Sequence, residues 1–391
     1  MYKKVRYYIF LRDVMILAVT AFGGPQAHLA MMLDLMVKKR GYLDENELIE
    51  LNALCQILPG PSSTQTITAI GFKVGGANLA YLTLLIWIVP AFLIMTTAGI
   101  AISYFGAQGI SLSFTKYIQP MAVGIVAYSA YVIIKKVVKT KVAFVLMVIS
   151  AIVSFLARSP FAFPIILIIG GSITAFNYKK VHKEERSKIK INWSNFLVWL
   201  GVFAGAAIIG GITQSFPVRI FENFYRNGSL IFGGGQVLVP LLYTEFVEFK
   251  AYLTSEEFLS GFALVQSVPG PVFSFAAFIG AISLHEGGIA AQIGGAALAA
   301  IGIFLPGTFL IFFIIRFWAE LKKFRIVKAS LDGITATSSG MVLAAAYILS
   351  IPLHGHWINY MLIISTFLIL LFTKIPSPVL IGIGLVLGFV I

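Results

Sequence analysis

Two short motifs occur twice in this chain, and each second copy lies 210 residues after the first. The sequence FGGPQ at 22–26 returns as FGGGQ at 232–236, and PGP at 59–61 returns at 269–271. An ungapped alignment from the start of the first motif to the end of the second gives 14 identities in 40 positions. Such a repeat constrains the fold strongly, because two homologous segments adopt the same structure twice. We therefore interpret the chain as a duplication.

The repeat lies in an unusually apolar chain. Of its 391 residues, 59% are hydrophobic and 12% are charged, whereas a soluble domain has about 25% charged residues. This composition excludes a soluble enzyme, and the net charge of +13 lies between apolar segments, which argues against nucleic-acid binding. It predicts an all-α polytopic membrane protein, surrounded by the lipid bilayer. We expect this membrane to be the plasma membrane. The sequence leaves open whether the protein forms a homo-oligomer.

The predicted layout has three parts. Residues 1–178 form the first repeat, 179–213 a basic cytoplasmic loop and a linker transmembrane helix, and 214–391 the second repeat. One extra crossing between two homologous halves places the second upside down relative to the first. The layout therefore predicts inverted repeats.

Basic residues change position between the halves, as inversion requires. Such residues favour the cytoplasm when they lie in short loops. In the first half they flank the motif segments, as Lys3, Lys4, Arg6, Lys38, Lys39, Arg40 and Lys73. In the second half they follow segment 288–317, as Lys322, Lys323, Arg325 and Lys328. We expect the N-terminus in the cytoplasm and the C-terminus outside.

Both ends of segment 7–37 are basic, so we expect it to enter the membrane, turn at Gly23–Pro25 and leave on the same side. The same argument makes 44–72 a second re-entrant hairpin with its tip at Pro59–Pro61. The corresponding segments of the second half are 221–249 and 254–285.

Two capping boxes, Asp44 with Glu47 and Thr254 with Glu257, start the helices that lead to the Pro-Gly-Pro tips. Each helix has about 15 residues and a length of about 22 Å, which is shorter than a bilayer core of about 30 Å. Nine full crossings are expected, at 77–105, 114–135, 142–157, 160–178, 193–212, 288–317, 330–350, 356–373 and 376–391.

The broken helices predict an anion site. Proline and glycine interrupt each helix inside the membrane, and a new helix N-terminus presents free N–H groups and a positive dipole end. Hydroxyl and amide side chains follow the breaks, so we expect a small oxyanion near the midplane. The candidate binding residues are Gly23, Gly24, Pro25, Gln26, Pro59, Gly60, Pro61, Ser62, Ser63, Gln65, Gly233, Gly234, Gly235, Gln236, Pro269, Gly270, Pro271 and Ser274.

Several alternatives remain open at this stage. Asp34 and Glu245 lie on the outgoing hairpin arms and are candidate carriers of a coupling proton, or interfacial carboxylates. His28 lies three residues beyond Pro25 and could titrate near neutral pH. We expect no catalytic residue, cofactor or metal centre, because Cys55 is the single cysteine and no phosphate loop or dinucleotide motif occurs. A membrane-embedded enzyme is the remote alternative.

These motifs, FGGPQAHLA with LPGP and FGGGQVLVPLL with VPGP, resemble those of the chromate ion transporter family in its long, two-domain form. The resemblance extends over essentially the whole chain. It implies two inverted halves and chromate efflux from the cytoplasm. It also implies functional roles for Phe22 and Phe232 beside the glycines and prolines of both motifs.

The resemblance has one departure. Many members carry an acidic or glutamine-containing stretch just after the first Pro-Gly-Pro, whereas Ser62–Gln65 contains no acid. The resemblance therefore assigns no proton-coupling role to this stretch. Sulfate has the shape and charge of chromate, so a sulfate or other oxyanion carrier would share every feature above.

Overall fold

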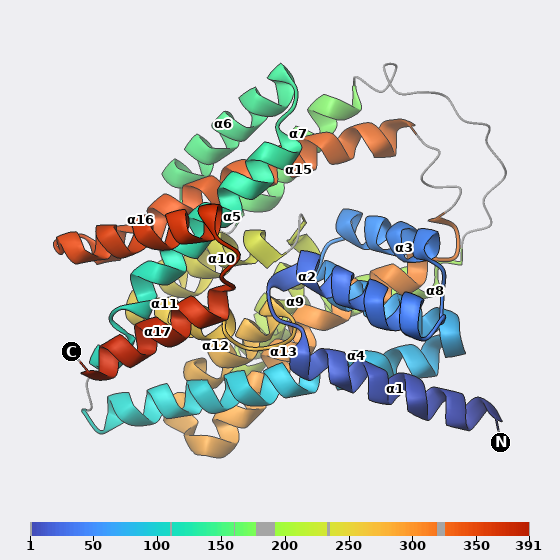
Figure 1. Cartoon of the computed structure of the whole chain (residues 1–391), viewed down its shortest axis with the longest axis horizontal. Coiled ribbons are helices and arrows are strands. Elements are labelled where there is room, and N and C mark those ends of the chain that lie inside the picture. The colour runs from blue at the N-terminus through green and yellow to red at the C-terminus, as the bar shows by residue number, and fades with distance from the viewer. Residues whose placement is uncertain are drawn as a thin grey trace. The chain divides into compact units, whose positions relative to one another are not determined.

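A computed structural model describes residues 2–109, 112–159, 161–176, 192–232, 235–318 and 325–390. The described segments are helical and contain no strand, which confirms the predicted all-α class (Figure 1). The chain forms two compact units, and each takes segments from both halves of the sequence. Unit 1 comprises 1–109, 192–230 and 264–315, and unit 2 comprises 110–191, 231–263 and 316–391.

The first half gives unit 1 its hairpin helices. They are α1 (Tyr2–Thr20), α2 (Gly24–Met32), a π-helix (Leu33–Lys39), α3 (Glu45–Ile57) and α4 (Ser62–Ala107). Non-helical dihedral angles at Gly75 and Gly76 divide α4 into a short arm and a long helix. The second half adds α8 (Ser194–Thr213), α9 (Phe216–Leu230), a 3-10 turn (Val272–Ser274), α12 (Phe275–Ser283) and α13 (Gly288–Ile314).

Unit 2 is built mainly from the helices that follow the hairpins. They are α5 (Ile118–Val137), α6 (Lys141–Ala157), α7 (Ala162–Ala175), α15 (Arg325–Ile348), α16 (Trp357–Phe372) and α17 (Ser377–Val390). It also holds α10 (Gly235–Tyr243), a π-helix (Thr244–Phe249) and α11 (Ser255–Val265), whose last two residues belong to unit 1. A Cβ on Gly333 would collide with the Gly170 carbonyl oxygen. Glycine therefore lets α7 and α15 touch through their backbones, as in membrane helix pairs.

Five helices are long and apolar enough to cross a membrane, and they lie at 62–107, 118–137, 194–213, 285–314 and 329–353. These five include or overlap five of the nine predicted crossings, namely 77–105, 114–135, the linker helix at 193–212, 288–317 and 330–350. The other four predicted crossings are shorter apolar helices, α6 with 17 residues, α7 with 14, α16 with 16 and α17 with 14. Each is below the roughly 20 residues that a straight crossing needs.

The predicted helix breaks and caps are present. In the first capping box, the Asp44 carboxylate accepts from the Glu47 N–H (2.8 Å) and the Glu47 carboxylate accepts from the Asp44 N–H (3.1 Å). Thr254 and Glu257 form the second box through bonds of 3.1 and 2.8 Å. The helices after these caps have 13 and 11 residues, somewhat fewer than expected, and both end before Pro-Gly-Pro.

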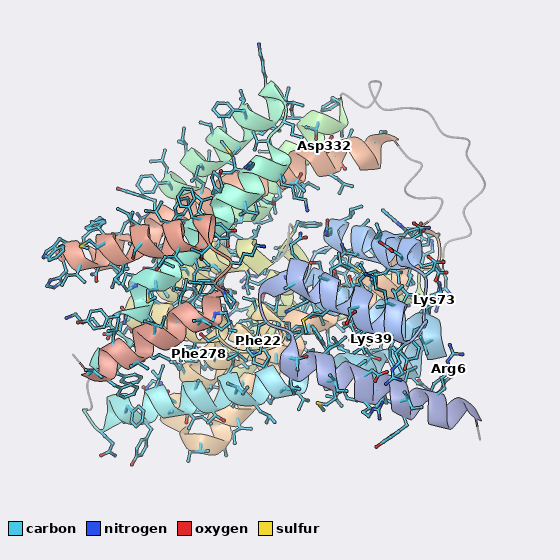
Figure 2. All side chains as sticks on the ribbon, viewed as in Figure 1. Arg6, Phe22, Lys39, Lys73, Phe278 and Asp332 are labelled. Atoms are coloured by element: carbon cyan, nitrogen blue, oxygen red, sulfur yellow. The ribbon has the colours of Figure 1, made fainter. Side chains whose placement is uncertain are left out.

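Within unit 1, the two ends of each first-half hairpin lie together. Asp13 on α1 is fully buried and pairs with Arg40 beyond the π-helix (2.8 Å), while the Tyr42 hydroxyl donates to the same carboxylate (2.9 Å). Glu47 at the start of α3 pairs with Lys73 at the end of the short arm of α4. Figure 2 shows Lys73 near one end of this unit together with Arg6 and Lys39, away from Phe22.

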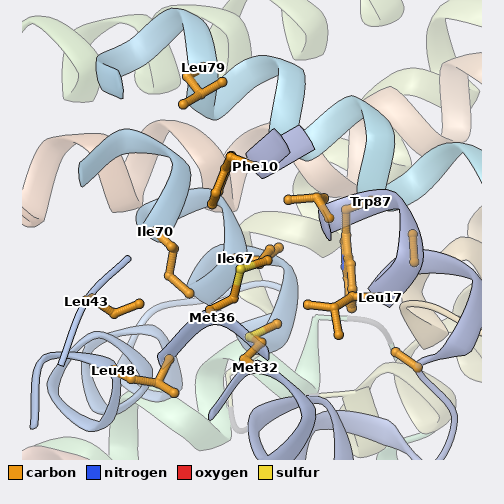
Figure 3. Close-up of a cluster of buried hydrophobic side chains, with 13 residues drawn as sticks. Phe10, Leu17, Met32, Met36, Leu43, Leu48, Ile67, Ile70, Leu79 and Trp87 are labelled. Atoms are coloured by element: carbon orange, nitrogen blue, oxygen red, sulfur yellow. The ribbon is translucent and has the colours of Figure 1, made fainter. Parts of the chain in front are cut away.

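An apolar core fills the space between these arms. The cluster includes Phe10 and Leu17 of α1, Met32 of α2, Leu48 of α3 and Trp87 of α4, all with at most 3% exposure (Figure 3). Burying apolar surface contributes about 25 cal/mol per Å². This cluster therefore holds the hairpin arms against α4 and fixes the positions of their tips.

Candidate functional site at the helix breaks of unit 1

The first break separates α1 from α2. Gly23 and Gly24 have φ angles of +90° and +76°, in a region that glycine tolerates and other residues rarely adopt. Pro25 lies in the first turn of α2, where its missing N–H costs no hydrogen bond. The carbonyl of buried Ala21, left free by the end of α1, accepts from the Gly270 N–H of the second repeat (2.8 Å).

The tip at Pro59–Pro61 leads into the first turn of α4. Pro61 is the N-cap residue of α4. The next four side chains, Ser62 to Gln65, are at most 6% exposed. The Gln65 N–H is the first to find a helical acceptor, the Pro61 carbonyl (2.9 Å). The N–H groups of Ser62, Ser63 and Thr64 have no acceptor within the helix.

Gln65 braces this tip and does not point an amide N–H toward an open site. Its Nε2 donates to the Pro59 carbonyl (2.8 Å) and to the Gly307 carbonyl of α13 (3.2 Å). Both acceptors are buried backbone groups, so the Gln65 amide satisfies them where the helices are interrupted. Gln65 therefore has a structural role in addition to its place in the predicted site.

The tip of the second repeat has a similar glycine conformation, but the helix that follows it starts differently. Gly270 has a φ of +105°, matching the +110° of Gly60. A 3-10 turn over Val272–Ser274 then precedes α12, whereas α4 begins directly after its proline. The Ser274 side chain is 0% exposed, and its hydroxyl has no hydrogen-bond partner among the described residues. A buried hydroxyl without a partner is a costly feature that a polar ligand would relieve.

The two tips pack against symmetry-related partners. A Cβ on Gly60 would lie 3.3 Å from the Cα of Gly307, and a Cβ on Gly270 would lie 3.2 Å from the Cβ of Ala91. Gly270 follows Gly60 by 210 residues, and Gly307 follows Ala91 by 216. These are the two offsets of the repeat, before and after a short insertion. Each tip therefore packs on the proline-containing helix of the other half.

His28 joins the three interrupted segments. It is 1% exposed, its Nδ1 lies 3.1 Å from the Ser63 hydroxyl, and its Nε2 lies 3.2 Å from the Ala21 carbonyl oxygen. The Trp87 ring stands edge-on to the imidazole at 5.4 Å and donates its own N–H to the Thr64 hydroxyl (3.1 Å). Since Ala21 also accepts from Gly270, two hydrogen bonds link the first break, α4 and the second tip.

The structure brings some candidate residues together and leaves others apart. Gly24, Pro25, Gly60, Ser63 and Gly270 belong to the linked segments described above. Gln26 is exposed on the opposite face of α2 from His28, because two residues correspond to about 200° of rotation in a helix. Phe22 is 38% exposed.

The FGGGQ motif of the second half lies in unit 2. Gly233 and Gly234 lie outside the described residues, Gly235 begins α10, and Gln236 lies in its first turn. The placement of the motif at a helix start is as expected, and its part in binding stays a prediction.

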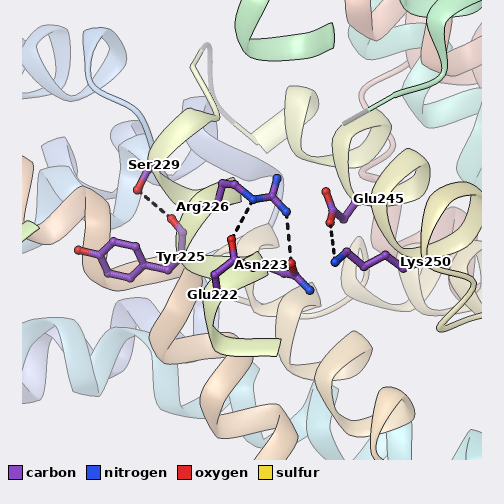
Figure 4. A network of polar contacts seen from close by, with 7 residues as sticks. All are labelled: Glu222, Asn223, Tyr225, Arg226, Ser229, Glu245 and Lys250. Atoms are coloured by element: carbon purple, nitrogen blue, oxygen red, sulfur yellow. Dashed lines mark hydrogen bonds and ion pairs between the residues drawn. The ribbon is translucent and has the colours of Figure 1, made fainter. Parts of the chain in front are cut away.

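Charged side chains of the hairpin arms form pairs (Figure 4). In unit 1, Arg226 donates to Glu222 (3.1 Å) and to the buried Asn223 (3.2 Å) on α9. In unit 2, the candidate Glu245 is 1% exposed and lies 3.6 Å from the Lys250 ammonium. The other carboxylate candidate, Asp34 of unit 1, is exposed and pairs with Lys39 (2.7 Å).

The sequence reasoning missed the roles of Ala21, Trp87 and Tyr42. A backbone carbonyl such as that of Ala21 carries no sequence signal. Trp87 and Tyr42 reach their partners through contacts 23 and 29 residues away in the chain. The sequence singles out His28 as a titratable residue near the first break, but it does not predict its contacts with Ser63 and Ala21.

Comparison with known proteins identifies the family. The family model described as chromate transporter matches this chain twice, at residues 9–176 and 218–389. A probable chromate transport protein of Synechococcus elongatus is 27% identical over 96% of this chain and 93% of its own length. A chromate transport protein of Cupriavidus metallidurans is 25% identical over 96% and 90%, respectively. An uncharacterized transporter of Methanocaldococcus jannaschii is 26% identical over 96% and 92%.

No solved structure matches the chain. The family match covers both repeats and nearly the whole sequence, and it agrees with the resemblance found from the motifs. This chain is a member of the chromate transporter family.

Proposed function

We propose that the protein is a secondary transporter that exports chromate from the cytoplasm, with the anion bound at the first turn of α4 beside the second tip. Relatives named chromate transport proteins align over 96% of the chain, which favours chromate as the substrate. The family is a transporter family, which favours transport over the alternative of a membrane-embedded enzyme.

The observation that carries the binding site is the junction of the tips in unit 1. The α4 N-terminus offers three N–H groups without helical acceptors, and Ser62 and Ser63 add buried hydroxyl groups. A helix N-terminus attracts an anion through these donors and its dipole. Buried Ser274 supplies an independent donor without a partner among the described residues.

The donors at the tips are neutral. Residues 58–66 and 266–283 contain no Asp, Glu, Lys or Arg. Neutral N–H and hydroxyl donors bind a tetrahedral dianion through hydrogen bonds and do not depend on the central atom. This favours a second candidate function, a carrier of sulfate or other oxyanions, which the same site would serve.

Contacts at the ends of the hairpins support the proposed membrane arrangement. The pairs Asp13–Arg40 and Glu47–Lys73 close the open ends of two hairpins, and basic residues gather at this end of unit 1. These contacts favour re-entrant hairpins that open toward the cytoplasm. The second repeat would open toward the outside, and alternating access would expose the anion to each side in turn.

The membrane potential is sufficient to drive export. When a dianion leaves a cell with a negative interior, its free energy falls by about 4.6 kcal/mol per 100 mV, which is twice the value for one elementary charge. Transport of chromate alone is therefore favourable without ATP. A coupled proton would change the net charge that moves with each anion.

Labelled-chromate uptake into everted membrane vesicles tests the proposal. We expect accumulation that depends on the protein and decreases at least tenfold in Ser274→Ala. The matched control is Ser283→Ala at the end of α12, because that hydroxyl donates to the Ile279 carbonyl (2.8 Å) and does not lie at the tip. Excess sulfate distinguishes a chromate-selective carrier from a general oxyanion carrier. Folded protein that moves neither anion would refute the proposed function.

A further inference from the structure

His28 is a buried titratable side chain that contacts the proposed anion site through one hydroxyl group. We propose that His28 couples proton binding to anion binding by controlling the direction in which the Ser63 hydroxyl donates its hydrogen bond. The inference rests on the proposed anion site at the start of α4. It makes His28 a positioning residue, since the imidazole acts on the anion through Ser63.

The hydrogen-bond partners fix the tautomer of neutral His28. The Ala21 carbonyl oxygen can only accept, so the Nε2 atom at 3.2 Å must carry the proton. Nδ1 then has only a lone pair. Ser63 must therefore donate its hydroxyl proton to Nδ1 across 3.1 Å. In this state the hydroxyl proton at the second residue of α4 is occupied and cannot reach an anion.

Protonation of His28 reverses this bond. A proton added at Nδ1 makes the imidazolium a donor to the Ser63 oxygen, and the hydroxyl proton is released to point elsewhere. The added proton comes from water and binds Nδ1. The Ser63 O–H bond stays intact and only changes direction. The site gains one hydrogen-bond donor and one positive charge at a helix N-terminus, and both changes favour a bound oxyanion.

Among the described residues, no charged side chain contacts the His28 ring. The described contacts of its ring are with Ala21, Ser63 and Trp87, all of which are neutral. The charged groups on the elements packed around it have other partners or lie near the far ends. On α1 these are Lys3, Lys4, Arg6, Arg12 and Asp13, and Asp13 is held by Arg40 and Tyr42. On the π-helix they are Asp34, Lys38 and Lys39, on α3 Glu45, Glu47 and Glu50, and on α4 Lys73.

Distance keeps these charges apart from His28. Asp13 precedes Ala21 by eight helical positions, and Lys73 follows Ser63 by ten, which correspond to about 12 and 15 Å along a helix. The transported anion is therefore the counter-ion that stabilises the imidazolium. By linkage, anion binding promotes proton binding and proton binding promotes anion binding to the same extent.

Proton uptake on anion binding tests the inference directly. Sulfate is the better probe, because it remains a dianion from pH 5.5 to 8 whereas chromate itself takes up a proton in this range. Calorimetric titration of the purified full-length protein, in two buffers with different ionisation enthalpies, gives the protons bound per anion. We expect proton uptake that is small at pH 8 and approaches one proton per sulfate as the pH falls toward 5.5, together with tighter binding at the lower pH. Chromate titrations under the same conditions show whether the site is occupied by the proposed substrate.

Two variants and a matched control locate the effect. His28→Gln should remove the proton uptake while the glutamine amide can still bond Ala21 and Ser63. Ser63→Ala should weaken binding about tenfold to a hundredfold, the value of a hydrogen bond to a charged group. It should also flatten the pH dependence of affinity. His285→Gln should change neither quantity, because His285 bonds the Ile282 carbonyl in a loop after α12 (2.9 Å).

The outcomes separate this inference from the proposed function. Anion binding without proton uptake in the unmodified protein would overturn the coupling and leave the transport proposal standing. This measurement needs no variant, so a folding defect in His28→Gln does not protect the inference. Uptake that persists in folded His28→Gln would also overturn it. A protein that binds neither sulfate nor chromate would overturn the proposed function and the coupling together.

Discussion

The packing of Gly270 against Ala91 gives a quantitative prediction. In Gly270→Ala, the backbone at a φ of +105° becomes strained, which costs about 1–3 kcal/mol. The new Cβ would also lie 3.2 Å from the Cβ of Ala91. A contact this close forces a shift that costs about 1–3 kcal/mol more. We therefore expect a total loss of about 2–6 kcal/mol in the free energy of unfolding.

Gly76→Ala is the matched control. Gly76 has a φ of +77°, and a Cβ there would meet nothing within 4 Å. The variant carries backbone strain without the contact and should lose about 1–3 kcal/mol. The reduced entropy of the unfolded chain is the same in both variants and cancels in their difference.

Ala91→Gly should specifically relieve the contact in Gly270→Ala. A double-mutant cycle, measured by thermal and denaturant unfolding in detergent, gives the coupling free energy between the two positions. It separates this coupling from the loss of helix stability that glycine causes at position 91. We expect a coupling of about 1–3 kcal/mol and partial recovery of chromate flux in the double variant. Equal destabilisation by Gly270→Ala and Gly76→Ala, with zero coupling to Ala91→Gly, would refute the packing argument.

Three further predictions concern unit 1, at the Asp13 ion pair, the Tyr42 hydroxyl and the Gln65 amide. Asp13→Ala should lower stability by about 2–3 kcal/mol, below the usual cost of breaking a buried pair because Arg40 is 36% exposed. Asp13→Asn should lose about half as much in the same unfolding assay, and equal losses would contradict the ionic contribution. Burial and the Asp13 hydrogen bond raise the pKa of Tyr42 to about 12. The stability difference between the protein and Tyr42→Phe should therefore stay constant from pH 7 to 9, below the ordinary tyrosine pKa of about 10, and decline as the pH rises from about 10 to 12. Gln65→Leu leaves two buried carbonyl groups without their donor and should cost about 2–4 kcal/mol and abolish flux. Normal flux in this variant would show that the brace is dispensable.

Local signals in the sequence predicted the interruptions of the helices. The capping box of Asp44 with Glu47 needs only residues three apart, and Pro-Gly-Pro breaks a helix through its own covalent geometry. These features depend on neighbouring residues, and the structure has them at the expected positions. The all-α class likewise followed from composition and apolar segment length.

The junction of the tips could not be predicted, because its contacts join distant residues. Gln65 and Gly307 are 242 residues apart, and their hydrogen bond depends on how the repeats pack. The phase of α2 was also undetermined from sequence. It buries His28 and exposes Gln26, although both follow the same proline within three residues. The compact units add a further difference from the sequence layout, since each combines segments of both halves.

The ion pair of Asp13 with Arg40 holds the ends of the first hairpin together, and it has a consequence for how such a chain can evolve. In the repeat alignment, Asn223 stands where the first half has Asp13, and Lys250 and Tyr252 stand where it has Arg40 and Tyr42. Asn223 bonds Arg226 on its own helix, and Lys250 pairs with Glu245. In a dimer of two identical subunits, every substitution would occur in both copies. An ion pair of this kind would then be gained or lost at both hairpins together. A single fused chain removes this constraint. One hairpin can keep its ion pair while the corresponding residues of the other hairpin change independently.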